Sequence, residues 1–167
     1  MRLLVRAARR RAADGANPAP ADSVLVAAPE GSHLVLYVED NPANVRVVEL
    51  ALAHRPGVRL ISALQGGLGA DLAAQHRPDL ILLDLHLPDL GGEEVLRRLR
   101  DDPNTRDTPV VVLSADATPR QVSRLRSAGA ADYLTKPLDL RNLLRVIDAT
   151  LGRARPRPPL PTEGTAP

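Results

Sequence analysis

The chain has 167 residues, of which 44% are hydrophobic and 25% charged, and its formal net charge is +2. This length suits one domain with a sizeable core. The absence of cysteine excludes disulfides and a cysteine-based metal site. No apolar stretch approaches the roughly 20 residues that a membrane span needs. The arginine-rich start at residues 1–11 has no apolar segment after it, so no secretory signal is expected and a cytoplasmic protein is predicted.

The charge is uneven along the chain. Residues 32–151 carry 14 Lys and Arg against 16 Asp and Glu, whereas residues 1–31 and 152–167 each have a net charge of +2. We therefore expect a disordered basic Ala/Pro-rich lead (1–31), a folded domain (32–151) and a disordered Arg/Pro-rich tail (152–167). No basic face with interleaved aromatic residues and no helix-turn-helix is visible, so nucleic acid is not an expected partner.

Short apolar runs predict the strands of a parallel sheet. Four of them lie at residues 33–38, 79–83, 109–113 and 131–135, and each ends at a polar residue of a different kind. Runs this short and this rich in Val, Ile and Leu are typical of strands that are buried on both faces. A further run at residues 58–63 is the expected second strand in chain order.

Helical patterns alternate with these runs. They follow Asn41-Pro42, span residues 68–75, and begin at Gly91-Gly92, Thr118-Pro119 and Asp139. Five such units predict an α/β fold, a doubly wound five-stranded parallel sheet with helices on both faces. The residues of the last three helices that should face the sheet are Val95, Leu96, Leu99, Val122, Leu125, Ala128, Leu143, Leu144, Ile147 and Leu151.

The polar residues that end four of the runs could carry chemistry. Glu39 and Asp40 follow the first run, and Asp84, Ser114 and Lys136 follow the other three. Ligands of open α/β sheets bind outside the carboxyl ends of the strands, so these side chains are expected on one rim. Three carboxylates suit a hard divalent cation, and a hydroxyl and a lysine beside them suit a phosphoryl group.

This set, in this order, resembles the receiver domain of two-component response regulators, over about residues 33–151. Three strings carry the resemblance: VEDNP at 38–42, LDLHLPDLGG at 83–92 and GAADYLTKP at 129–137. The resemblance implies the flavodoxin-like strand order 2-1-3-4-5. The switch point of that order lies between the first and third strands and brings Glu39, Asp40 and Asp84 together.

The resemblance implies that Asp84 is the phosphorylation site, taking a phosphoryl group from a sensor histidine kinase or a phosphotransfer protein. Glu39, Asp40, Asp84 and the backbone carbonyl of His86 would bind Mg²⁺, with the His86 side chain exposed beside the site. The residues alone allow other roles. An aspartate after a strand often caps a loop, and the acid pair, or Asn41, could cap the following helix.

Lys136 is the only lysine, beside 21 arginines. Its ammonium, a point charge on a flexible stem, can contact one carboxylate and one phosphoryl oxygen. The resemblance implies a cis Lys136–Pro137 bond, a hydrogen bond from Ser114 to the phosphoryl group, and an inward switch movement of Tyr133. Asp84, Ser114 and Lys136 would then be the catalytic set. Tyr37 is expected only to pack.

The expected output is a conformational change. Phosphorylation should bias the face made by the fourth helix, the fifth strand and the fifth helix, and a weak homodimer would use the same face. No output domain is expected in the chain, so the signal would pass to another protein. No enzyme activity is expected beyond the domain's own phosphorylation and dephosphorylation. Two arrangements fit: a free single-domain regulator, or a receiver detached from a hybrid sensor kinase.

Two other classes stay open on the residues. An interaction module would keep the acid site without turning over phosphate, and no mass gain with acetyl phosphate and Mg²⁺ would favour it. A haloacid-type phosphatase also has an aspartate nucleophile on a doubly wound sheet. That enzyme needs a second aspartate two residues later as acid and base, and position 86 is histidine, which argues against it.

Overall fold

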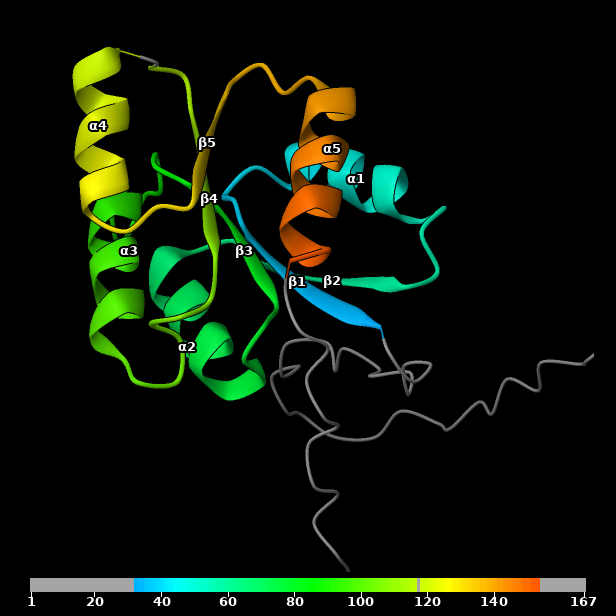
Figure 1. The fold of residues 1–167 in the computed structure, drawn as a ribbon, viewed down its shortest axis with the longest axis horizontal. Coiled ribbons are helices and arrows are strands. Elements are labelled where there is room, and N and C mark those ends of the chain that lie inside the picture. Colours follow the sequence, from blue (N-terminus) through cyan, green and yellow to red (C-terminus); the bar gives the residue numbers. More distant parts are fainter. Residues whose placement is uncertain (1–31, 117, 154–167) are drawn as a thin grey trace, which may run out of the picture.

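The computed structural model of the protein describes residues 32–116 and 118–153, in which strands and helices alternate (Figure 1). The predicted lead (1–31) and residues 154–167 of the predicted tail lie outside the described residues. The strands are β1 (His33–Val38), β2 (Val58–Ala63), β3 (Leu80–Asp84), β4 (Val110–Ser114) and β5 (Asp132–Thr135). The helices are α1 (Pro42–Leu52), α2 (Gly66–His76), α3 (Gly92–Asp101), α4 (Pro119–Ser127) and α5 (Leu140–Leu151).

The strands form one parallel sheet in the order β2-β1-β3-β4-β5, which confirms the predicted topology. Helices α1 and α5 cover one face, and α2, α3 and α4 cover the other (Figure 1). Every residue of β3 and β4 is buried, as expected for central strands between two helical layers. Each buried aliphatic side chain of these strands contributes about 1.5–3 kcal/mol relative to exposure in water.

Three helices begin with side-chain caps. Asn41 accepts a hydrogen bond from the Ala43 amide (2.9 Å) at the start of α1, and Pro42 suits its first turn. Thr118 and Asp139 cap α4 and α5, as predicted. Since Asn41 caps α1, the neighbouring acid pair does not need to do so.

Helix α2 begins two residues before its predicted start at residue 68. The side chain of Gln65 makes no capping hydrogen bond. The first two residues of the helix, Gly66 and Gly67, have a low intrinsic helix propensity. The carboxylate of Asp89, in the β3–α3 loop, instead accepts hydrogen bonds from the Gly66 and Gly67 amides (2.8 and 2.9 Å). The amides of Gly67 and Gly66 hold the pKa of Asp89 below its ordinary value. The cap therefore comes from a loop more than twenty residues away.

The predicted inward position of Ala128 was wrong. Leu125 of α4 is buried and Val122 is half-buried, whereas Ala128 is exposed and forms the C-cap of the helix. A spacing of three residues rotates each successive side chain by about 60° around an α-helix. The third member of the series therefore leaves the face that contacts the sheet.

Substitution of Gly92 tests how closely α3 approaches β3. A Cβ at Gly92 would lie 2.3 Å from the backbone oxygen of Asp84 and 2.7 Å from the Cα of Leu85. Gly92→Ala should lower the free energy of unfolding by about 1–3 kcal/mol, because backbone atoms must shift to admit the methyl group. Gly91→Ala is the matched control, since a Cβ there meets nothing within 4 Å. Equal free energies of unfolding for the two variants in a denaturant titration would contradict this packing argument.

Among residues 32–116 and 118–153, no helix combines the length and the apolar character that crossing a bilayer requires.

Candidate functional site

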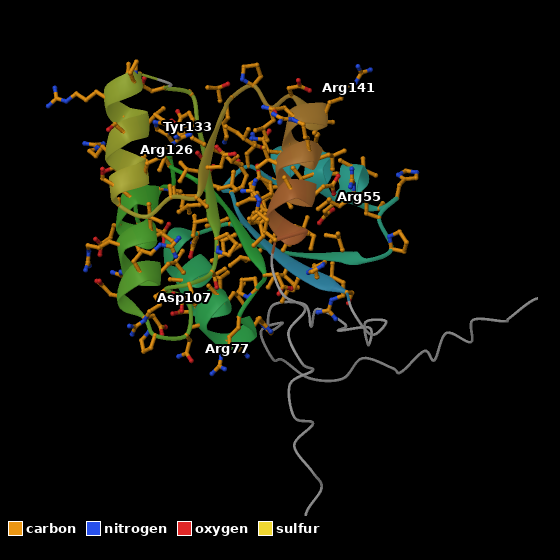
Figure 2. All side chains as sticks on the ribbon, viewed as in Figure 1. Arg55, Arg77, Asp107, Arg126, Tyr133 and Arg141 are labelled. Atoms are coloured by element: carbon orange, nitrogen blue, oxygen red, sulfur yellow. The ribbon has the colours of Figure 1, made fainter. Side chains whose placement is uncertain are left out.

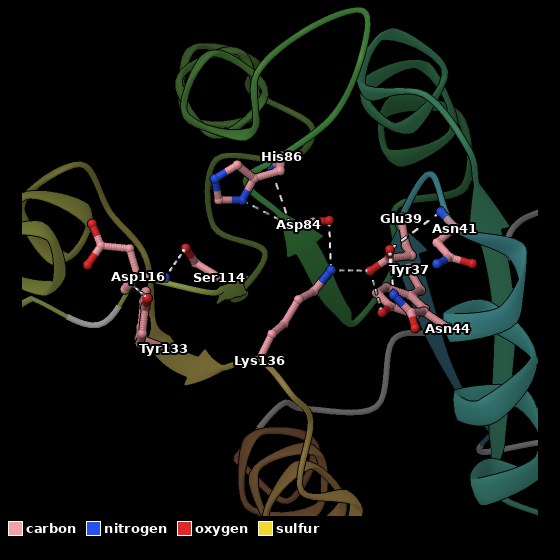
Figure 3. Close-up of polar contacts among 10 residues, drawn as sticks. All are labelled: Tyr37, Glu39, Asn41, Asn44, Asp84, His86, Ser114, Asp116, Tyr133 and Lys136. Atoms are coloured by element: carbon pink, nitrogen blue, oxygen red, sulfur yellow. Dashed lines mark hydrogen bonds and ion pairs between the residues drawn. The ribbon is translucent and has the colours of Figure 1, made fainter.

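The predicted site residues lie where the carboxyl ends of the strands meet. Val38 of β1 pairs with Leu83 of β3, so the next residues, Glu39 and Asp84, are neighbours. Figure 3 shows the Lys136 side chain reaching between these two carboxylates.

Three carboxylates form the acidic cluster. Oxygens of Glu39, Asp40 and Asp84 all lie within 4.8 Å of one another. Glu39 is 1% exposed and Asp84 2% exposed, while Asp40 is exposed and has no hydrogen bond or ion pair with another described residue. One ammonium faces three ionisable carboxylates, so the ionised cluster has a formal charge of −2. That charge and these all-oxygen donors fit a hard divalent cation.

Lys136 joins two of the three carboxylates. Its Nζ lies 2.7 Å from Glu39 Oε2 and 2.7 Å from Asp84 Oδ2. The Lys136–Pro137 peptide bond is cis, as the resemblance implied. Burial alone would lower the pKa of Lys136, but the hydrogen bonds to Asp84 and Glu39 outweigh burial and raise that pKa. The ammonium is therefore charged at neutral pH.

Glu39 accepts hydrogen bonds at both of its oxygens. Tyr37 Oη (2.8 Å) and Lys136 donate to Oε2, and Asn44 Nδ2 (2.9 Å) and the Asn41 amide (3.4 Å) donate to Oε1. Burial alone would raise the pKa of Glu39, but the side-chain donors hold it below its ordinary value. The ionised carboxylate therefore stabilises the fold above that ordinary pKa, and this contribution is lost as the pH falls through the lowered pKa.

Asp84 is held from two sides. Its Oδ2 accepts from Lys136, and its Oδ1 accepts from the backbone amide of His86 (3.1 Å). The His86 side chain is 69% exposed, as expected of a residue beside the site. The loop that carries His86 is also tied to α2, because Asp89 caps that helix.

Ser114 and Tyr133 meet at Asp116. Ser114 is fully buried at the end of β4, and its Oγ accepts a hydrogen bond from the Asp116 amide (3.2 Å). The Tyr133 hydroxyl donates to the backbone oxygen of Asp116. Figure 3 shows both side chains on the side of Asp84 away from Glu39. Ser114 at the end of β4 and Tyr133 in β5 therefore both hydrogen-bond to Asp116 in the loop after β4, and Tyr133 lies outside the carboxylate cluster.

Sequence reasoning missed two donors to Glu39. Tyr37 was expected only to pack, yet its buried hydroxyl donates to Glu39. Asn44 lies one turn into α1 beside the buried Val45. The polar Asn44 next to the apolar residues of this helix was the sign in the sequence that its side chain has a hydrogen-bond partner. Side-chain alternation also puts residues 37 and 39 of an extended chain on the same side of the sheet.

The chain belongs to the response regulator receiver family. The family model of the response regulator receiver domain matches residues 35–148. The chain is 37% identical over 120 residues to the polar-differentiation response regulator DivK of Brucella anthropi, a match that covers 72% of this chain and 97% of that protein. DivK of Brucella ovis is 36% identical over 120 residues, which cover 72% of this chain and 97% of that protein.

Solved receiver domains have the same fold. One is the receiver domain of a sensor histidine kinase from Pseudomonas aeruginosa, which has a magnesium ion coordinated in its active site cleft. It is similar with a TM-score of 0.66 and 34% identity, over 72% of this chain and 98% of that one. The receiver domain of a putative LuxO repressor protein from Vibrio parahaemolyticus is similar with a TM-score of 0.68 and 28% identity. The match covers 73% of this chain and 92% of that one. The protein is thus a receiver domain of a two-component system, and its acidic cluster fits a phosphoacceptor site.

Proposed function

We propose that Asp84 accepts a phosphoryl group from the phosphohistidine of a sensor histidine kinase or a phosphotransfer protein. The observation that carries this proposal is the position of Asp84 beside two further carboxylates, with the Lys136 ammonium 2.7 Å away. An oxygen of the ionised Asp84 attacks phosphorus. The P–N bond to the donor imidazole breaks, and the imidazole keeps that electron pair and takes up a proton from solvent. The product is an acyl phosphate.

Lys136 is suited to the charge that this transfer brings. The incoming phosphoryl oxygens are anionic, and an ammonium already in contact with Asp84 can turn toward one of them as a point charge. Ser114 lies at the end of the adjacent strand. Its hydroxyl can donate a hydrogen bond to a phosphoryl oxygen once Asp84 is phosphorylated.

Glu39, Asp40, Asp84 and the backbone carbonyl of His86 are the proposed holders of Mg²⁺. The net charge and the all-oxygen donors of the acidic cluster support this assignment. A divalent cation supplies neutralisation of charge on phosphoryl oxygens.

Asp40→Ala should weaken Mg²⁺ binding and block phosphorylation, because it removes the carboxylate that has no partner among the described residues. We expect affinity to fall by more than about tenfold, since loss of even an outer partner of a metal ligand costs 10–100-fold. Calorimetric titration with MgCl₂ measures this. Asp107→Ala is the control for charge, because Asp107 is exposed and lies away from the site (Figure 2). Unchanged Mg²⁺ affinity in Asp40→Ala would refute its role as a ligand.

Intact-mass measurement after treatment with acetyl phosphate and Mg²⁺ tests the function as a whole. A mass gain of one phosphoryl group supports the phosphoacceptor, and no gain favours an interaction module. The remaining parts of the proposal are a cytoplasmic location, an unidentified protein target, catalysis limited to the domain's own phosphorylation and dephosphorylation, and a weak homodimer through α4, β5 and α5.

A further inference from the structure

We propose that Tyr37 is a positioning residue of the phosphoacceptor site, acting through the carboxylate of Glu39. The inference rests on the proposed function and adds to it a group that contacts neither the phosphoryl donor nor the acceptor aspartate. Tyr37 is 0% exposed, and its hydroxyl lies 2.8 Å from Glu39 Oε2.

Strand geometry places the tyrosine for this contact. Residues two apart in a strand point to the same face, so Tyr37 at the end of β1 and Glu39 just beyond it share the face that α1 and α5 cover. The ring of Tyr37 packs in an aliphatic cluster that includes Val48 and Leu143. The hydroxyl at the far end of that ring reaches the acidic cluster.

The contact fixes the orientation of the carboxylate. Four hydrogen-bond donors contact the carboxylate of Glu39. Tyr37 and Lys136 share Oε2, and Asn44 and the Asn41 amide share Oε1. Rotation of the carboxylate would break several of these bonds at a residue that is 1% exposed, where water cannot readily replace them. The oxygen that Tyr37 holds is also the one that contacts Lys136, so the tyrosine helps to set where the ammonium lies.

A role in packing alone does not need the hydroxyl. Phenylalanine would fill the same volume, and a buried hydroxyl is unfavourable unless it is paired. The charge-assisted bond to Glu39 satisfies that hydroxyl. The side chain is thus both part of the core and a donor to the site.

Tyr37→Phe removes only this donor and tests the proposal. We expect the affinity for Mg²⁺, measured by calorimetric titration with MgCl₂, to fall by about tenfold, as is usual when the partner of a ligand is lost. Thr105→Val is the matched control, because it removes a buried hydroxyl that donates to the backbone oxygen of Leu99 and not to the acidic cluster. It should leave the affinity unchanged.

A double-mutant cycle separates positioning from packing. Glu39→Asp keeps the charge but retracts the carboxylate by one methylene group, out of reach of the tyrosine. If Tyr37 acts through Glu39, Tyr37→Phe should cost about tenfold in the parent and nothing further in the Glu39→Asp background. An equal loss of affinity in both backgrounds, or no loss in either, overturns the positioning role.

The same titrations distinguish this inference from the proposed function. If the parent protein binds Mg²⁺, Asp40→Ala binds it more weakly, and Tyr37→Phe matches the parent, only the role of Tyr37 is wrong. If the parent protein itself does not bind Mg²⁺, the proposed metal site fails, and the inference about Tyr37 fails with it.

Discussion

Asp84→Asn is expected to abolish phosphorylation by acetyl phosphate or by a phosphorylated kinase. The amide keeps the shape of the side chain, but an amide oxygen is not a nucleophile of comparable strength to a carboxylate. Among the described residues, only Lys136 and the His86 amide donate hydrogen bonds to the carboxylate of Asp84, whereas the other buried carboxylate at Lys136, that of Glu39, has four donors. The mass gain seen in the parent should therefore be absent.

The variant should remain folded. The oxygen of the new side-chain amide can still accept a hydrogen bond from Lys136, so the buried group keeps its charged partner. Removing one of three clustered carboxylates also relieves repulsion between like charges. Thermal unfolding checks this point, and Asp107→Asn is the distant control that should retain the mass gain. A phosphoryl group found on the folded Asp84→Asn variant would show that another side chain is the acceptor.

The central part of the site was predictable because sheet geometry is regular. Parallel strands end on one edge, so polar residues directly after apolar runs must lie close together once the strand order is known. Glu39, Asp84 and Lys136 follow this rule, and the structure brings them into contact. The sequence also predicted the caps of α4 and α5, because a cap acts within three residues of its own position.

Contacts that depend on distant loops were not predictable in the same way. The start of α2 depends on Asp89, and local propensity at Gly66 and Gly67 gives no sign of a helix. The link from Ser114 and Tyr133 to Asp116 likewise depends on how one loop folds over two neighbouring strands. Hydrophobic periodicity in the sequence does not predict such a contact between a loop and distant residues.

Tyr37 shows a different reason for failure. Its aromatic ring does pack in the core, so the prediction from hydrophobic pattern was right about burial and incomplete about chemistry. A tyrosine in a buried strand has a polar end that needs a partner. Two residues later the chain carries an acid on the same face, and this pairing was visible in the sequence.

Lys136→Arg is expected to separate phosphorylation from the conformational response. The variant keeps a positive charge near Asp84, so phosphorylation should survive at a reduced rate. In the parent, one nitrogen contacts both Glu39 Oε2 and Asp84 Oδ2 at 2.7 Å. A planar guanidinium is wider and more rigid and cannot place a single nitrogen in that position, so it should not couple the phosphoryl group to the end of β5.

Amide chemical shifts with and without the phosphoryl mimic beryllofluoride measure the coupling. In the parent, the mimic should shift the amides of Ser114, Tyr133 and α4, because Asp116 joins the first two residues just before that helix. In Lys136→Arg these shifts should be lost, while amides next to Asp84 still respond to the bound mimic. Arg141→Lys, on the first turn of α5, is the control and should respond as the parent does. If Lys136→Arg shows the same shifts in Ser114, Tyr133 and α4 as the parent, the ammonium is not the group that carries the signal from Asp84, because a cation of different shape would then transmit it equally well.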